Sequence, residues 1–248
     1  MPDWNDWWES PLGQYVIEHE QAYFDQVVTN LFGFHAVQVG MSQLDLLRAN
    51  RMPHRIKIGR VGMVDLHCDP ANLPLESGSI DLIVLPHVLD FNANPHQVLR
   101  EAERVLVADG QLLIAGFNPW SLWGGKRLWL KRQGMPWRGH FLSLPRIKDW
   151  LKLLSFDISD NQLTCYVPPF VQPQWRQRFG FMERLGARWW PVAGGVYFLH
   201  AVKRVQGMRL ITPAWQQHKL RARLAALAER QGANVSTHQK GSTGPHHE

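Results

Sequence analysis

Three residues that could bind or transform a small molecule stand at the ends of predicted strands. Gly40 follows the first strand, and Asp69 and His87 lie at the carboxyl ends of the third and fourth. A glycine lets the backbone approach a ligand closely, a carboxylate accepts hydrogen bonds, and a histidine with a pKa of about 6.5 can act as a general base. Because the carboxyl ends of parallel strands share the edge at which α/β sheets bind ligands, these residues predict a site there.

The sequence lacks the motifs of several other enzyme classes. No G-x-G-x-x-G follows the first strand, which argues against a nicotinamide enzyme, and no G-x-S-x-G supports a hydrolase. No C-x-x-C or H-E-x-x-H occurs, and His67, Cys68 and Asp69 alternate in direction along a strand, so no metal site is predicted.

Strands and helices alternate along most of the chain. Residues 80–88 are almost entirely apolar, which is typical of a central parallel strand buried on both faces. The alternation predicts an α/β fold with a mostly parallel sheet between helices. Strands are predicted at residues 34–39, 55–59, 63–69, 80–88, 111–116, 157–167 and 194–205, and helices at 11–31, 42–50, 95–106 and 144–156.

The stretch from Asp69 to Asn118 resembles a known family. Asp69-Pro70-Ala71, Leu73-Pro74-Leu75 and the later Ile80-Asp81-Leu82-Ile83-Val84 are similar to the region after the third strand of class I S-adenosylmethionine (SAM)-dependent methyltransferases, type 11-like (UbiE-like). The resemblance implies a Rossmann-like, mostly parallel seven-stranded sheet with helices on both faces. It also implies SAM as the cofactor.

The same resemblance implies which residues line the site. Asp69 would face the adenine amino group, and Asn118 and Trp120, after the fifth strand, would face the methyl acceptor. His87 would line the bottom of the cofactor pocket, either as a hydrogen-bonded structural residue or as a catalytic base. The predicted cofactor-binding residues are Val39, Gly40, Met41, Asp69, Pro70, Ala71, Leu85, Pro86 and His87.

The loop after the first strand departs from the family pattern. Family members carry several glycines there, whereas residues 34–47 contain Gly40 alone. Gln38 stands where an acid is usual, and Met41 to Leu44 occupy the glycine-rich stretch. The second strand is followed by Arg60 in place of the acid that binds the ribose.

Two functions are compatible with these observations. The first is methyl transfer from SAM to an unidentified acceptor. The second is a catalytically inactive methyltransferase-like module that binds RNA, a membrane or a protein through its basic, Trp-rich C-terminal half. The loop from Gly40 to Leu44 distinguishes them, because an enzyme needs room there for the methionine part of SAM. In an inactive module, Met41 or Leu44 could fill that space.

Basic residues concentrate in the C-terminal half. Residues 1–125 hold 7 Lys+Arg and 15 Asp+Glu, whereas residues 126–248 hold 20 and 6. The chain also has 12 tryptophans, several of them beside Lys and Arg at residues 120–140. These features predict an anionic partner, RNA or a membrane surface, bound through residues 126–230; an ordinary solvated surface is the open alternative.

The predicted domain organisation follows composition. A helical cap is expected at residues 1–33 and the methyltransferase-like domain at 34–205, with Trp/Arg-rich insertions at 118–143 and 168–193. A basic helix (206–230) and a disordered tail (231–248) would follow.

Localisation is predicted from what the sequence lacks. No apolar run reaches the roughly 18 residues of a transmembrane helix, and the first residues do not have the pattern of a secretory signal. Two cysteines, Cys68 and Cys165, do not make a disulfide framework. We therefore expect a cytoplasmic protein, with peripheral membrane contact as an open alternative.

Overall fold

The computed structural model describes residues 4–130, 134–169, 181–190 and 192–204, all within one compact unit, Met1–Val205. The predicted basic helix (206–230) and tail (231–248) lie outside the described residues, as does much of the predicted 168–193 insertion. In the described part, no helix is long and apolar enough to cross a membrane.

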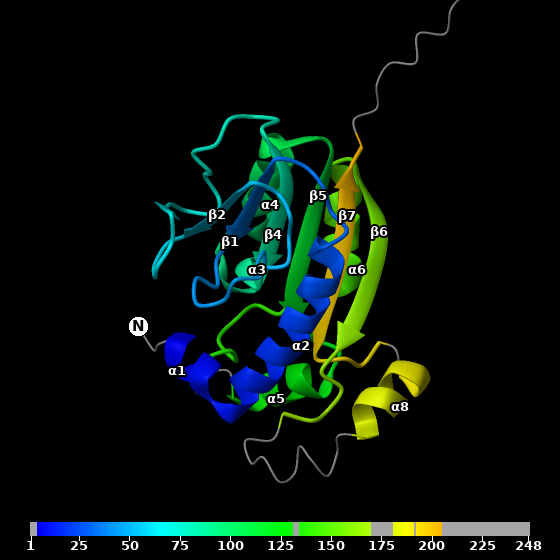
Figure 1. Ribbon diagram of the computed structural model, residues 1–248. Helices are drawn as coiled ribbons and strands as arrows, with labels where there is room; N and C mark the ends of the chain where they lie inside the picture. Colours follow the sequence, from blue (N-terminus) through cyan, green and yellow to red (C-terminus); the bar gives the residue numbers. More distant parts are fainter. Residues whose placement is uncertain (1–3, 131–133, 170–180, 191, 205–248) are drawn as a thin grey trace, which may run out of the picture. The chain divides into compact units, whose positions relative to one another are not determined.

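The described strands form one seven-stranded sheet in the order β3-β2-β1-β4-β5-β7-β6 (Figure 1). Neighbouring strands from β3 to β5 are parallel, whereas β7 runs antiparallel to both β5 and β6. The predicted Rossmann-like class I fold is therefore confirmed. The strands are β1 (His35–Val39), β2 (His54–Gly59), β3 (Leu66–His67), β4 (Ile80–Pro86), β5 (Leu106–Phe117), β6 (Phe156–Thr164) and β7 (Val196–Lys203).

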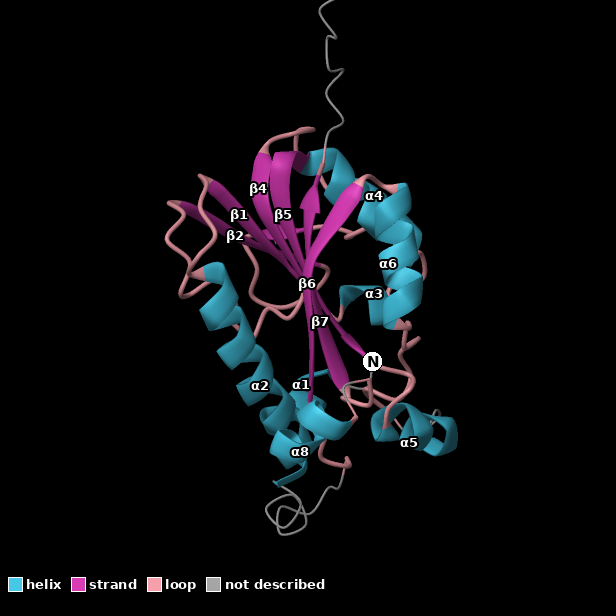
Figure 2. Cartoon of the chain, turned by 90° about the vertical axis from the view of Figure 1, so that its right-hand side faces the viewer, coloured by secondary structure: helices cyan, strands magenta, loops and turns pink. Residues whose placement is uncertain are grey.

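Helices cover both faces of the sheet (Figure 2). One face packs against α4 (Pro95–Val105) and α6 (Leu144–Leu153), through side chains such as Leu99 and Leu151. The other face packs against α2 (Pro11–Val28), through side chains such as Phe24. The other helices in the described part of the chain are α1 (Trp4–Glu9), α3 (Val88–Phe91), α5 (Leu122–Leu130) and α8 (Phe181–Trp189).

Local sequence explains where α2 begins. Ser10 is its N-cap and accepts a hydrogen bond from the Gly13 amide at 3.1 Å, and Pro11 occupies the first helical position. The helix ends at Val28, a few residues before the predicted end at Leu31.

The predicted helix at residues 42–50 is wrong, because the segment after β1 forms a series of turns. Leu46 and Leu47 are buried as a helix would bury them, but side chains replace the helical hydrogen bonds. The Asn50 amide donates to the Val28 carbonyl at 2.7 Å, and the Asp45 carboxylate accepts from the Leu47 amide at 3.2 Å. The β1–β2 crossover is therefore held by polar side chains.

Two other predicted elements differ in extent. The strand predicted at residues 63–69 is reduced to the two residues of β3, because Lys57 pairs instead with Asp65 through both backbone and carboxylate. The strand predicted at residues 111–116 is longer in the structure, because β5 begins at Leu106 and includes Asp109-Gly110, where Asp109 has a φ of 60° and the register with β4 shifts. These residues form a bulge in a longer strand.

Candidate active site

The carboxyl ends of β1 to β5 meet at the lower end of the sheet in Figure 1, beside α1, α3 and α5. Four groups of polar residues gather at this edge. They are the β1 loop built around Gln38, the Arg60–Asp69 pair after β2 and β3, the buried cluster of His87, and the Asn118–Trp120 turn after β5.

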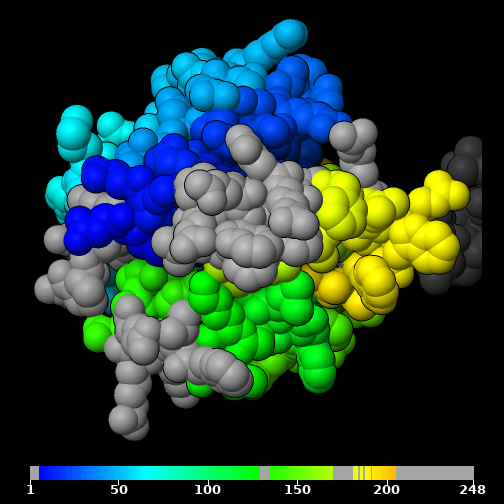
Figure 3. All heavy atoms as spheres, turned by 90° about the horizontal axis from the view of Figure 1, so that it is seen from below, coloured from blue at the N-terminus to red at the C-terminus, as the bar shows by residue number. Residues whose placement is uncertain are grey.

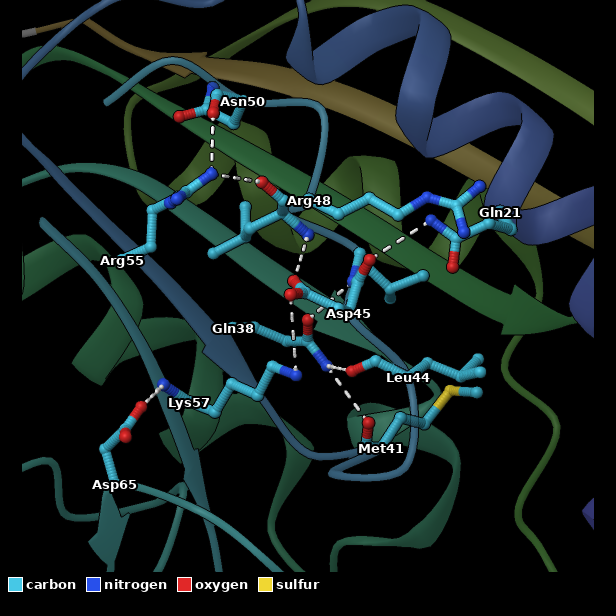
Figure 4. Close-up of polar contacts among 12 residues, drawn as sticks. Gln21, Gln38, Met41, Leu44, Asp45, Arg48, Asn50, Arg55, Lys57 and Asp65 are labelled. Atoms are coloured by element: carbon cyan, nitrogen blue, oxygen red, sulfur yellow. Dashed lines mark hydrogen bonds and ion pairs between the residues drawn. The ribbon is translucent and has the colours of Figure 1, made fainter. Parts of the chain in front are cut away.

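Gln38 shapes the loop after β1 (Figure 4). Its side-chain amide is fully buried and donates to the carbonyls of Gly40, Met41 and Leu44 at 3.2, 3.0 and 3.0 Å. Its Oε1 accepts from the Leu46 amide at 2.9 Å. A carboxylate at this position could only accept hydrogen bonds. The glutamine amide therefore stabilises a loop whose carbonyls point toward residue 38.

The loop begins with two residues in the left-handed region. Gly40 has a φ of 82° and Met41 a φ of 46°. A Cβ on Gly40 would lie 3.1 Å from the Val88 side chain, so glycine allows the β1 loop and the end of β4 to approach closely. Met41 and Leu44 pack against the core on the α2 face of the sheet.

Asp69 and Arg60 form an ion pair at the ends of β3 and β2. The guanidinium of Arg60 donates to Oδ2 of Asp69 at 2.6 Å, and Oδ1 accepts from the Ala71 amide at 3.0 Å. The Arg60 hydrogen bond, helped by that from Ala71, lowers the pKa of Asp69. The Asp69 side chain is 40% exposed, whereas Pro70 and Ala71 are buried beside it.

His87 is buried between two carboxylates. Its Nε2 lies 2.5 Å from Oε1 of Glu20 on α2, and its Nδ1 lies 3.1 Å from Oδ2 of Asp90 on α3. The same Asp90 oxygen accepts from the Phe117 amide at 2.9 Å, which ties the cluster to the end of β5. The cluster therefore fastens α2 to the site edge of the sheet.

This environment fixes the protonation state of His87. Burial alone would lower the pKa of His87, but Glu20 and Asp90 outweigh burial and raise that pKa to about 9. Burial raises the pKa of Asp90, and the hydrogen bond with His87 partly offsets the rise. At neutral pH His87 is thus an imidazolium with both ring nitrogens engaged, an arrangement that favours a pocket wall over a general base.

The turn after β5 carries the predicted acceptor side. Asn118 is buried, donates to the carbonyls of Val192 and Gly194 at 2.8 and 2.9 Å, and accepts from the Trp120 amide at 3.0 Å. Its side chain therefore positions the turn. Trp120 is 76% exposed and borders a hollow of about 260 Å³. The hollow is lined by Pro119, Trp120, Phe141, Leu142, Ser143 and Arg146.

The structure brings the predicted site residues to one edge of the sheet, but with different exposure. Val39, Leu85 and Pro86 are buried strand residues, and Gly40, Met41 and Asp69 are partly accessible. Sequence reasoning missed Glu20 and Asp90. Glu20 had a detectable signal: positions 12, 16, 20, 24 and 28 follow one face of α2, and Glu20 is the charged member. In the described residues no cluster of acids, histidines or cysteines could hold a metal ion.

Comparisons with known proteins agree with this architecture. A model of the methyltransferase domain matches residues 28–114, from the end of α2 into β5. The uncharacterized protein YafS of Escherichia coli (strain K12) is 31% identical over 228 residues, which are 91% of each chain. The chain belongs to the type 11 methyltransferase family.

Solved structures share the fold of this type 11 methyltransferase at low sequence identity. A SAM-dependent methyltransferase of Thermotoga maritima, described as a possible histamine N-methyltransferase, has a TM-score of 0.61 at 15% identity, covering 81% of this chain and 94% of that one. Geranyl diphosphate C-methyltransferase of Streptomyces coelicolor, in complex with S-adenosyl-L-homocysteine, has a TM-score of 0.52 at 13% identity, covering 75% and 76%. At these identities the likeness concerns the fold.

Proposed function

We propose that this type 11 methyltransferase binds SAM at the carboxyl edge of β1–β4 and transfers its methyl group to an acceptor held beside Trp120. The position of Met41 and Leu44 carries the proposal. Both side chains pack against the α2 face of the core. An inactive module is expected to use them to fill the cofactor side of the loop, so their packing supports the enzyme over that alternative.

The described residues fit most of SAM. The half-exposed Asp69 can accept a hydrogen bond from the adenine amino group, with Pro70 and Ala71 as the adjoining wall. The ion pair between Asp69 and Arg60 is exposed and contributes only about 0–1 kcal/mol. Replacing this hydrogen bond to Asp69 with one from a ligand therefore costs little free energy. The left-handed backbone at Gly40 and Met41 places the start of the loop where it can approach the methionine part of SAM.

The ribose end fits less well. Arg60 follows β2, and a guanidinium cannot accept hydrogen bonds from the ribose diol. Losing one charged hydrogen-bond partner costs about 1.5–3 kcal/mol, so we expect SAM to bind roughly 10–150-fold more weakly than it would with a ribose acid.

The protein's contribution to the reaction is mainly positional. When bound, SAM would supply an electrophilic methyl group on its sulfonium, with S-adenosylhomocysteine as the leaving group, and the protein would position it against the acceptor. Asp69 orients the adenine end, and Asn118 holds the turn that carries Trp120. His87, held as an imidazolium by Glu20 and Asp90, fixes the end of β4 against β5 and α2.

Titration with SAM and with S-adenosylhomocysteine tests the proposal, read by tryptophan fluorescence and thermal shift. Both ligands are expected to give a saturable signal, and Asp69→Ala should weaken binding roughly 10–150-fold. Asp109→Ala is the matched control, because Asp109 is an exposed acid that pairs with Arg204 near the start of β5. The proposal fails if neither ligand changes either signal at millimolar concentration, or if the two variants bind equally well.

A further inference from the structure

Two helices at the site end of the molecule turn apolar side chains to solvent. The helices are α5 (green) and α8 (yellow), and Figure 3 shows both on the face seen from below. A helix on the surface of a globular protein normally buries its apolar stripe and exposes its charges. Both helices depart from this arrangement by exposing large apolar side chains, although α5 also buries Trp123 in the core.

In α8 the inward side is polar or small. The Glu183 carboxylate accepts hydrogen bonds from the Tyr15 hydroxyl and from the Val167 amide, the latter at 3.3 Å. Gly186 lies against Tyr166, whose ring would be 2.6 Å from an added Cβ. At four-residue spacing on the outward side, Phe181, Leu185 and Trp189 are 53%, 46% and 69% exposed.

In α5 the cations turn toward the protein. Lys126 donates to the Pro169 carbonyl and lies over the Trp137 ring, and Arg127 donates to the Gly139 carbonyl at 2.7 Å. Leu122 and Leu128 face outward and are 54% and 75% exposed.

The apolar surface continues between these helices and the sheet. Trp190 and Val192, which follow α8, are 66% and 71% exposed, and Trp120, which precedes α5, is 76% exposed. Concentrated exposure of large apolar side chains marks an interaction site. We call the outward residues Leu122, Leu128, Leu185, Trp189, Trp190 and Val192 the α5–α8 surface.

We propose that the α5–α8 surface docks on an anionic lipid bilayer. Outward leucine and tryptophan are residues with which amphipathic helices enter the boundary between head groups and acyl chains. Charge complementarity supports an anionic membrane, because residues 126–248 hold 20 basic and 6 acidic side chains.

Most of these side chains are a poor match for RNA. The leucines and Val192 have no ring that could stack on a base, although Trp189 and Trp190 do. All of them can enter the apolar boundary of a bilayer.

Vesicle flotation of the full chain tests the proposal. Vesicles of phosphatidylglycerol and phosphatidylcholine in equal amounts should bind the protein, and pure phosphatidylcholine vesicles should bind it less. The double substitution Leu128→Glu/Leu185→Glu should reduce binding at least about 10-fold, because two apolar side chains lose their burial in the bilayer and two negative charges are added. Both sites are exposed, and the thermal unfolding midpoint checks that the variant folds.

Leu153→Glu is the matched control. Leu153 is 83% exposed at the end of α6, next to the start of β6 at the opposite edge of the sheet, and its replacement should leave vesicle binding unchanged. Three results would overturn the proposal: no vesicle binding by the wild-type chain, an equal loss in both variants, or tighter binding to a single-stranded RNA that the double substitution does not weaken. None of these measurements requires SAM, so they stand apart from the proposed methyl transfer.

Discussion

Replacement of Glu20 by alanine is expected to lower the free energy of unfolding by about 3–5 kcal/mol, because it breaks a buried ion pair and leaves the His87 imidazolium with one carboxylate. Chemical denaturation at neutral pH measures the change. Glu18→Ala is the matched control, since Glu18 is an exposed residue of the same helix and its loss should cost no more than about 0.5 kcal/mol. Equal costs for the two variants would show that α2 is not fastened through His87.

The cost of Glu20→Ala should also depend on pH. The pKa of His87 is raised from 6.5 to about 9 in the folded protein, so its contribution is fully present below about pH 6.5 and is lost as pH rises through about 9. We therefore expect the difference in unfolding free energy between wild type and Glu20→Ala to shrink from pH 7 to pH 10. A difference that stays constant over this range would contradict the assignment of an imidazolium.

Replacement of Gln38 by glutamate should destabilise the protein by about 3 kcal/mol or more, although an acid is usual at this position in the family. The glutamine amide donates to three loop carbonyls from a fully buried site, and a carboxylate there would face those carbonyls without donors. Denaturation measures the loss, and SAM binding should weaken with it because the loop is reshaped.

Gln26→Glu is the control for this substitution. It makes the same chemical change at an exposed residue of α2 and should alter stability by no more than about 0.5 kcal/mol. If Gln38→Glu is as stable as the wild type, the loop does not depend on the amide donors of Gln38.

Much of the fold could be predicted because its signals are local. The apolar run of β4 and the alternation of elements predicted the central parallel sheet, and the helix predicted from residue 11 begins there as α2. The helix predicted at residues 42–50 failed, because the leucine spacing there is also satisfied by turns once Gln38 and Asn50 supply the hydrogen bonds. Hydrogen bonds from individual side chains such as these leave no periodic pattern in the sequence.

The site was predicted less completely than the fold. Asp69 and His87 were found because each follows a recognisable strand. The partner of His87 is Glu20, which lies 67 residues earlier, so its pairing depends on the docking of α2. The same contact changes the chemistry expected of the histidine. A free imidazole could accept a proton, whereas a histidine whose pKa two carboxylates raise to about 9 is already protonated at neutral pH.

Hydrogen exchange with and without S-adenosylhomocysteine tests most directly whether SAM occupies the edge between the β1 loop and Asp69. Slower exchange is predicted for amides of residues 40–44 and 69–72 on ligand addition, while β6, far along the sheet from β1, stays unchanged. Absence of protection at saturating ligand, or protection confined to another part of the chain, would contradict this placement of the cofactor.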